Sequence, residues 1–314
     1  MVTGFITVIS GSENYKLMIN RRKFIKQTAY SSAALAVAPT LLNYCTQKPW
    51  FQISLAEWSF HRALQGEQLD NFEFPVKAKR DFGITAVEYV STFFDQNEVN
   101  PRYLDELKRI TDYHGVKNVL IMVDGEGDLG SPDEQKRGDA IENHRKWVDA
   151  ARHLGCFAIR VNASGPGSAD ELGQNVVKGL YQLAAYAQPK GISVIVENHG
   201  GFSSDGQWLS KVIKSVNLPN CGTLPDFGNF NIRKGVTYDR YRGVKELMPY
   251  AKDVSAKTYD FDESGNETTI DYDRMMRIVK RSGYRGYIGI EYEGDHYTEE
   301  EGIMLTKKLL ERYL

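Results

Sequence analysis

The sequence predicts an α/β protein whose folded part is a single (β/α)8 TIM barrel, preceded by an N-terminal export leader. A helix–glycine–strand unit recurs along the chain, the strand segments are almost uniformly apolar, and eight such segments follow one another. They lie about 30–40 residues apart, the length of one βα unit. With 314 residues, 41% of them hydrophobic, and a net charge of −2, the composition is that of a soluble globular protein.

Residues 1–48 are expected to form a leader outside the barrel. Arg21 and Arg22 open a basic segment, and an apolar stretch free of acidic residues follows at 29–42. This order is typical of an export signal, and the stretch is too short to span a bilayer. The arginine pair resembles a twin-arginine signal, and Cys45 stands where a lipoprotein signal places its modified cysteine. We therefore expect an exported protein, periplasmic or held at the membrane by a lipid anchor at Cys45.

The barrel is expected over residues 49–314, where helical segments end in glycine shortly before an apolar strand. Glycine accepts the left-handed conformation that closes a helix, and a short loop then leads into a buried strand. This pattern occurs at Gly83, Gly115, Gly155, Gly191 and Gly283. The eight predicted strands are Phe51–Leu55, Ala86–Val90, Asn118–Val123, Ala158–Ala163, Ser193–Asn198, Cys221–Asp226, Asp253–Lys257 and Tyr287–Tyr292.

The helices between these strands have a different periodicity. Leu104, Leu107 and Ile110 are three residues apart, so they form one apolar stripe on a helix. Eight βα units fill about 265 residues, which fits a closed barrel of ~250 residues better than an open, doubly wound sheet. No linker rich in proline or serine divides this region, so we expect one domain.

Several functions are disfavoured by composition. A net charge near zero argues against a nucleic-acid partner, which requires a basic surface. No glycine-rich dinucleotide fingerprint follows the first strand, so no nucleotide cofactor is expected. Cys156 and Cys221 both fall in predicted core segments, where two buried thiols are expected rather than a disulfide.

The active site of such a barrel lies at the carboxyl ends of its strands. The polar and aromatic residues there are therefore the candidates for catalysis and substrate binding. From strand one to strand eight they are Trp58, His61, Glu88, Arg160, Asn162, Glu197, His199, Asp226, Asn229, Lys257 and Glu291. For the histidines and aromatic residues, ordinary structural roles are an alternative, and Glu88 and Arg160 could form a layer inside the barrel.

Three carboxylates in this set point to a metal. Glu197, Asp226 and Glu291 each end or follow an apolar strand, where an unpaired carboxylate is costly. Three converging carboxylates repel one another, and a hard divalent cation relieves that repulsion. We expect one Mn²⁺ or Mg²⁺ per chain, held by these three residues. The alternative is that each carboxylate caps a helix or pairs with Arg160 or Lys257.

Three motifs, VIVENHGG at 194–201, LPDFGN at 224–229 and IGIEYEG at 288–294, resemble the xylose isomerase-like barrel superfamily of sugar isomerases and epimerases. In its ketose 3-epimerase branch, two glutamates, an aspartate and a strand-seven histidine bind one divalent metal. The resemblance implies these carboxylate roles for Glu197, Asp226 and Glu291. It also implies a histidine where this chain has Ser255, while the neighbouring lysine is kept as Lys257. Asn229 likewise stands where the family often has a histidine.

The resemblance and the residues together indicate a sugar isomerase or epimerase. The metal would acidify the C–H next to a carbonyl, and Glu197 and Glu291 would remove and return the proton. Lys257 would stabilise the enediolate oxygen. Alternatives are a lyase or dehydratase acting on a keto-sugar, a secreted carbohydrate-binding protein, and an endonuclease IV-like phosphodiesterase, which six histidines and the absence of a basic excess disfavour. The partner would be a small sugar or keto-sugar, and the sequence leaves the oligomeric state open.

Overall fold

The computed structural model describes residues 49–94 and 99–314. The expected leader, including Arg21, Arg22 and Cys45, lies outside the described residues, so its role in export or lipid anchoring stays a prediction. Among the helices of the described part, none has both the length and the apolar character that crossing a membrane requires.

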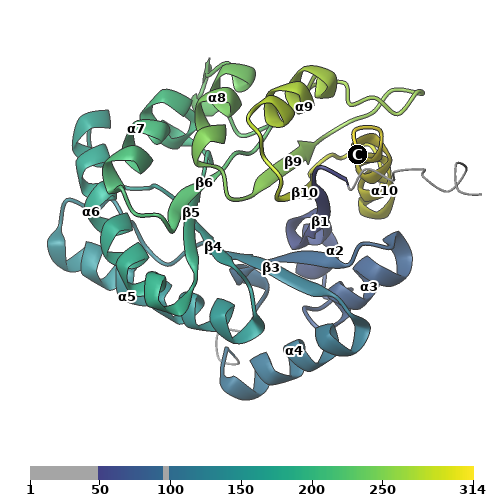
Figure 1. The fold of residues 1–314 in the computed structure, drawn as a ribbon, viewed down its shortest axis with the longest axis horizontal. Coiled ribbons are helices and arrows are strands. Elements are labelled where there is room, and N and C mark those ends of the chain that lie inside the picture. The colour runs from purple at the N-terminus through teal and green to yellow at the C-terminus, as the bar shows by residue number, and fades with distance from the viewer. Residues whose placement is uncertain (1–48, 95–98) are drawn as a thin grey trace, which may run out of the picture. The chain divides into compact units, whose positions relative to one another are not determined.

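Eight parallel strands form a sheet that curls into a barrel (Figure 1). Along the sheet the strands lie in the order β6-β5-β4-β3-β2-β1-β10-β9. Isolated parallel bridges, Thr223–Ala251 and Asp226–Ser255, connect the β6 edge to the β9 edge. The predicted TIM barrel is thereby confirmed. The strands are β1 (Gln52–Ala56), β2 (Ala86–Val90), β3 (Lys117–Met122), β4 (Ala158–Val161), β5 (Ser193–Glu197), β6 (Cys221–Leu224), β9 (Val254–Thr258) and β10 (Tyr287–Tyr292).

The helices lie around the outside of the strands (Figure 1). Their bounds are α2 (His61–Gln65), α3 (Glu73–Phe82), α4 (Pro101–His114), α5 (Glu134–Leu154), α6 (Ala169–Ala187), α7 (Gly206–Val216), α8 (Arg240–Leu247), α9 (Tyr272–Arg281) and α10 (Glu299–Glu311). The predicted glycine stops are present: α3 ends at Gly83 with φ of 67° and α5 at Gly155 with φ of 80°. Both values lie in the left-handed region that favours glycine.

The core has two parts. The larger apolar cluster packs the helices against the outer face of the strands. A smaller cluster, which includes Leu120, Met122, Ile195 and Leu224, fills the inside of the barrel. Cys156 and Cys221 are free, buried thiols, as predicted. Because apolar side chains fill much of the interior, the buried polar side chains there stand out as candidates for a site.

The predicted strands agree with the observed ones to within two residues at each end. Ala86–Val90 and Tyr287–Tyr292 match in full, whereas β6 ends at Leu224, because Pro225 follows and has no N–H to donate. A short antiparallel hairpin, β7 (Asn231–Arg233) with β8 (Val236–Thr237), was not predicted. It follows Asp226 and Asn229 in the chain, so it lies on the loop that carries part of the candidate site.

Candidate functional site

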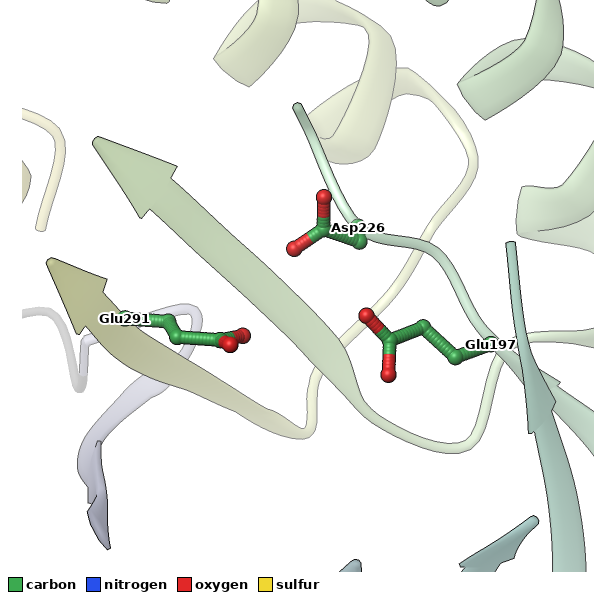
Figure 2. Close-up of side chains that lie close together, drawn as sticks. All are labelled: Glu197, Asp226 and Glu291. Carbon is green, nitrogen blue, oxygen red and sulfur yellow. The ribbon is translucent and has the colours of Figure 1, made fainter. Parts of the chain in front are cut away.

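Three carboxylates converge inside the carboxyl end of the barrel (Figure 2). Glu197 is the last residue of β5, Asp226 follows β6, and Glu291 lies in β10. Their exposed fractions are 1%, 0% and 5%. One oxygen from each lies within 4.8 Å of the others. The structure therefore brings together the residues that the sequence predicts as metal ligands.

Asp226 is held by backbone groups on both sides. Its own N–H donates to the side-chain oxygen of Asn198 at 2.8 Å, and the Asn198 amide donates to the carbonyl oxygens of Asp226 and Asn229. The Oδ1 atom of Asp226 accepts from the N–H groups of Gly228 and Asn229, each at 2.7 Å. Hydrogen bonds from several elements thus fix this carboxylate.

Lys257 supplies one positive charge to the site. Its Nζ lies 2.8 Å from Oε1 of Glu291 and 2.9 Å from Oε2 of Glu293. The lysine side chain is 2% exposed, whereas Glu293 is half-buried at the mouth of the barrel. A buried ammonium is tolerated only when it is paired, and here two carboxylates pair with it. Lys257 therefore connects the buried carboxylates with the mouth.

Arg160 supplies the second positive charge. Its Nε lies 2.8 Å from Oε2 of Glu197, and its Nη1 donates to Oδ1 of Asp124 at 2.7 Å. Asn162 donates to the same Asp124 oxygen at 2.6 Å, and Asn229 donates to Oε1 of Glu197 at 2.9 Å. The predicted alternative, in which Arg160 and Lys257 pair with the carboxylates, is thus present together with the convergence of the three acids.

Ser255 occupies the space between two of the carboxylates. Its Oγ lies 2.7 Å from Oδ2 of Asp226 and 2.6 Å from Oε2 of Glu291. A hydroxyl has one proton to donate, so it satisfies only one of these ionised acids at a time. The strand register is therefore the one that the sequence implies, with Ser255 facing the site where the resemblance implies a histidine.

The carboxylates differ in their affinity for protons. Burial raises the pKa of Glu197 to about 7, although Arg160 opposes the shift. Burial likewise raises the pKa of Asp226 to about 7, against the attraction of Lys257. For Glu291, burial acts upward too, but the charge and hydrogen bond of Lys257 outweigh it and lower the pKa. Acids with separated proton affinities in one pocket are typical of proton-transfer sites.

The model of the xylose isomerase-like TIM barrel family matches residues 76–313, most of the chain. The chain belongs to this family.

The curated relatives match this chain only over short segments. The alpha subunit of a C-glycoside deglycosidase from Arthrobacter globiformis is 42% identical over 66 residues, which cover 20% of this chain and 19% of the relative. The alpha subunit of a 3'-dehydrocarminate deglycosidase from a Microbacterium species is 37% identical over 51 residues, 16% of this chain and 15% of the relative. The chain thus spans less than one fifth of the length of these relatives.

Several solved structures share the fold over nearly their whole length. A D-allulose 3-epimerase from a Methylomonas species has a TM-score of 0.66 at 17% identity, covering 85% of this chain and 99% of that one. An IolI protein with a bound zinc atom has 0.65 at 16%, covering 84% and 99%. The 3-keto-D-glucoside 4-epimerase of E. coli has 0.62 at 16%, covering 82% and 99%. At such low identity these similarities establish the fold.

The remaining residues that the sequence predicts for the site lie at different depths in the barrel. Trp58 is half-buried, donates from Nε1 to Glu293 at 2.9 Å and stacks on His61 and Phe93. His199 is exposed after β5. Glu88 lies deeper, 1% exposed inside the barrel, where Ser54 donates to it. The structure thus places Trp58 beside the mouth and Glu88 in an interior layer.

Glu293 and Tyr259 also lie at the site. The sequence places Glu293 among the polar residues that end strand eight without giving it a role, and Tyr259 is not among its candidates. Glu293 shares Lys257 with Glu291, and it stands two residues after Glu291, just past the end of β10. Tyr259 stands two residues after Lys257, just past the end of β9, and a side chain added at Gly228 would meet both its hydroxyl and the Lys257 stem. Tyr259 carried no motif, so only the fold reveals its position.

The donor set fits a hard divalent cation. Glu197, Asp226 and Glu291 offer only oxygen atoms, the ligands that Mg²⁺ and Mn²⁺ prefer, and the Ser255 hydroxyl adds a further oxygen. Arg160 and Lys257 each pair with one of the three acids, Glu197 and Glu291 respectively. The oxygen-only set makes a thiolate-preferring metal a poor match.

Proposed function

We propose that this chain is a sugar isomerase or epimerase that transfers a proton at the carbon next to a carbonyl group. The observation that carries the proposal is the convergence of Glu197, Asp226 and Glu291 inside the carboxyl end of the barrel, beside the buried Lys257. Membership of the xylose isomerase-like family and the epimerase folds support it. The small molecule processed would be a sugar or keto-sugar.

Glu197 and Glu291 are proposed to handle the proton. They come from β5 and β10, on either side of β6 and β9 in the ring of strands, so they approach a bound substrate from different directions. One glutamate removes the proton and the other returns it, at the opposite face for epimerisation or at the adjacent carbon for isomerisation. Lys257 and Arg160 hold positive charge close to both, where a developing enediolate oxygen is stabilised.

Glu197, Asp226 and Glu291 are also the residues proposed to hold one Mn²⁺ or Mg²⁺. A cation there supplies Lewis acidity that makes the C–H next to a carbonyl easier to deprotonate. The protein's own contribution is to bury the three acids, to anchor Asp226 through the Gly228 and Asn229 amides, and to orient Glu197 through Asn229.

A lyase acting on a keto-glycoside is the second candidate. The partial matches to C-glycoside and 3'-dehydrocarminate deglycosidase subunits favour it. The first step is the same: a glutamate takes the proton from the carbon next to the carbonyl. The electron pair of that C–H bond then forms a C=C bond, and the group on the following carbon leaves with its bonding pair. Product analysis separates this reaction from epimerisation.

The test is deuterium incorporation from D₂O into a 3-keto-glucoside, followed by NMR, together with the metal content of the purified full-length protein. The expected results are exchange at the carbon next to the carbonyl and about one Mn²⁺ or Mg²⁺ per chain. A Glu197→Gln/Glu291→Gln double variant is expected to lose both. A Glu106→Gln/Glu142→Gln variant, altered at exposed helical residues, is the matched control and should retain both.

The products decide between the candidates. A new stereoisomer or positional isomer supports the isomerase or epimerase, whereas release of the substituent supports the lyase. If the protein exchanges no proton with any keto-sugar and takes up no metal from excess Mn²⁺ or Mg²⁺, the enzymatic proposal fails. A carbohydrate-binding barrel is then the better description.

A further inference from the structure

A cavity of about 560 Å³ lies beside the loop that carries Asp226. It begins at Gly228, two residues after Asp226, and continues along the β7–β8 hairpin to the start of α8. Its wall includes the rings of Phe230, Tyr238, Tyr241 and Tyr259. A volume in this range is typical of a small-molecule site.

Tyr259 connects this cavity to the carboxylates. It lines the cavity and follows β9, which carries Lys257. A side chain at Gly228 would collide with the Tyr259 hydroxyl and come within 2.7 Å of the Lys257 Cγ. Gly228 thus leaves room for the ring of Tyr259 beside Lys257. The Tyr259 hydroxyl thus lies beside Gly228, whose N–H donates to Asp226.

Two polar groups of the cavity wall lack partners among the described residues. Nη1 of Arg240 is buried and makes no hydrogen bond there, and the Tyr259 hydroxyl makes none either. The other two tyrosines differ, because Tyr238 donates to Glu246 at 2.7 Å and Tyr241 accepts from the Asp271 N–H at 2.9 Å. Buried donors are normally satisfied, so this guanidinium nitrogen is a donor left over at the cavity wall.

We propose that this cavity binds the aglycone of a glycoside substrate, and that the aglycone is an aromatic ring bearing oxygen substituents. Aromatic walls stack on a planar ring, and Arg240 and Tyr259 donate to phenolic or carboxylate oxygens. The sugar ring then lies at Glu197, Asp226 and Glu291. This inference rests on the proposed function in assigning the sugar to the carboxylate site. It adds the class of substrate: a keto-glycoside rather than a free sugar.

The test measures binding and turnover separately on the full-length protein. Calorimetry compares 4-hydroxyphenyl β-D-glucoside with methyl β-D-glucoside, which lacks the aromatic ring. We expect the aryl glucoside to bind at least about tenfold more tightly. Arg240→Gln should weaken aryl binding about tenfold and leave methyl binding unchanged. Arg277→Gln, the same change at an exposed arginine outside the cavity, should alter neither.

Equal affinity for the two glucosides, or an Arg240→Gln variant that binds the aryl compound normally, would overturn the proposal. Tighter binding of cellobiose than of the aryl glucoside, with the same dependence on Arg240, would replace the aromatic aglycone by a second sugar. Selective aryl binding without deuterium exchange into 3-keto-glucosides supports the cavity and refutes the proposed reaction. Deuterium exchange into 3-keto-glucosides that shows no preference for an aryl substituent supports the proposed reaction and refutes the proposal for the cavity.

Discussion

Ser255 is the residue at which this chain departs most clearly from the metal site that its motifs imply. Its hydroxyl contacts Asp226 and Glu291, so a histidine introduced there would direct a ring nitrogen at the same carboxylates. We expect Ser255→His to bind Mn²⁺ or Zn²⁺ at least about tenfold more tightly than the natural chain, because imidazole is a stronger ligand than a hydroxyl. Calorimetric titration with the metal measures the change.

Ser255→Ala is the matched control for that substitution. It removes the hydroxyl and adds no ligand, so its metal affinity should be equal to or below that of the natural chain. The melting temperature of each variant, measured without metal, reports whether the larger histidine is accommodated at this buried position. A folded Ser255→His variant that binds metal no better than Ser255→Ala would contradict the idea that this position belongs to the metal site.

Glu88 makes stability depend on pH. Burial raises its pKa from the ordinary 4.5 to about 8; Ser54 opposes the shift and Glu291 adds to it. Between these values the folded chain keeps a proton that the unfolded chain releases, so stability falls as pH rises from 4.5 towards 8. We expect Glu88→Gln to remove this pH-dependent loss in the free energy of unfolding, which is on the order of 2–4 kcal/mol. Urea unfolding at pH 5 and pH 8 measures the change.

Glu263→Gln provides the comparison for Glu88→Gln, because Glu263 is a solvent-exposed residue of the loop before α9. Its unfolding free energy should follow that of the natural chain at both pH values. If Glu88→Gln shows the same fall in stability between pH 5 and pH 8 as the natural chain, Glu88 is ionised in the fold and its proton is not the cause.

At the scale of elements, two helical glycines should respond oppositely to alanine. In α6, a Cβ at Gly179 would overlap the carbonyl oxygen of the buried Leu129, whereas in α5 a Cβ at Gly138 meets no heavy atom within 4 Å. Gly179→Ala should destabilise the protein by about 2 kcal/mol through overpacking. Gly138→Ala should stabilise it by about 0.5–1 kcal/mol, since alanine favours the helix. Urea unfolding measures both. Equal effects of the two substitutions on the free energy of unfolding would show that the loop at Leu129 moves to make room for the new methyl group on α6.

The elements also show what a sequence can predict. Strands such as Ser193–Glu197 and Tyr287–Tyr292 were predictable because an apolar run bounded by glycine has few alternatives. The convergence of Glu197, Asp226 and Glu291 followed from one rule, that parallel strands end at one edge. The β7–β8 hairpin was not predictable, because its strands are short and exposed.

Side-chain pairings within the site were harder to predict than the strands. Nothing in the spacing of the chain tells whether Lys257 faces Glu291, Glu293 or Asp226, since all three lie at the same edge of the barrel. The depth of a side chain in the barrel was equally hard to predict from the sequence. Glu88 lies within β2 and inside the barrel, whereas Trp58 lies in the short helix Glu57–Phe60 that follows β1, beside the mouth.

At the scale of the whole molecule, the barrel has a weak seam between β6 and β9. Most neighbouring strands pair along several residues, as β2 and β3 do from Ala86 to Val90. Between β6 and β9 the ladder is reduced to isolated bridges, with the Ser255 N–H donating to Pro225 at 3.0 Å and the Phe227 N–H to Ser255 at 3.2 Å. The proposed metal ligands lie on both sides of this seam.

Metal binding should therefore close the barrel as well as complete the site. Glu197 and Asp226 belong to the β5–β6 side and Glu291 to β10, beyond β9, so one cation bound by all three links the two edges. We expect Mn²⁺ to slow hydrogen exchange in peptides covering 223–227 and 252–256 more than in β3 and β4, and to raise the melting temperature with concentration. Exchange followed by mass spectrometry, with and without Mn²⁺, measures this.

The Glu197→Gln/Glu291→Gln variant should show no response, because it retains too few ligands to bridge the seam. Slowing that is uniform over the barrel, or that persists in the double variant, would show that the cation binds elsewhere.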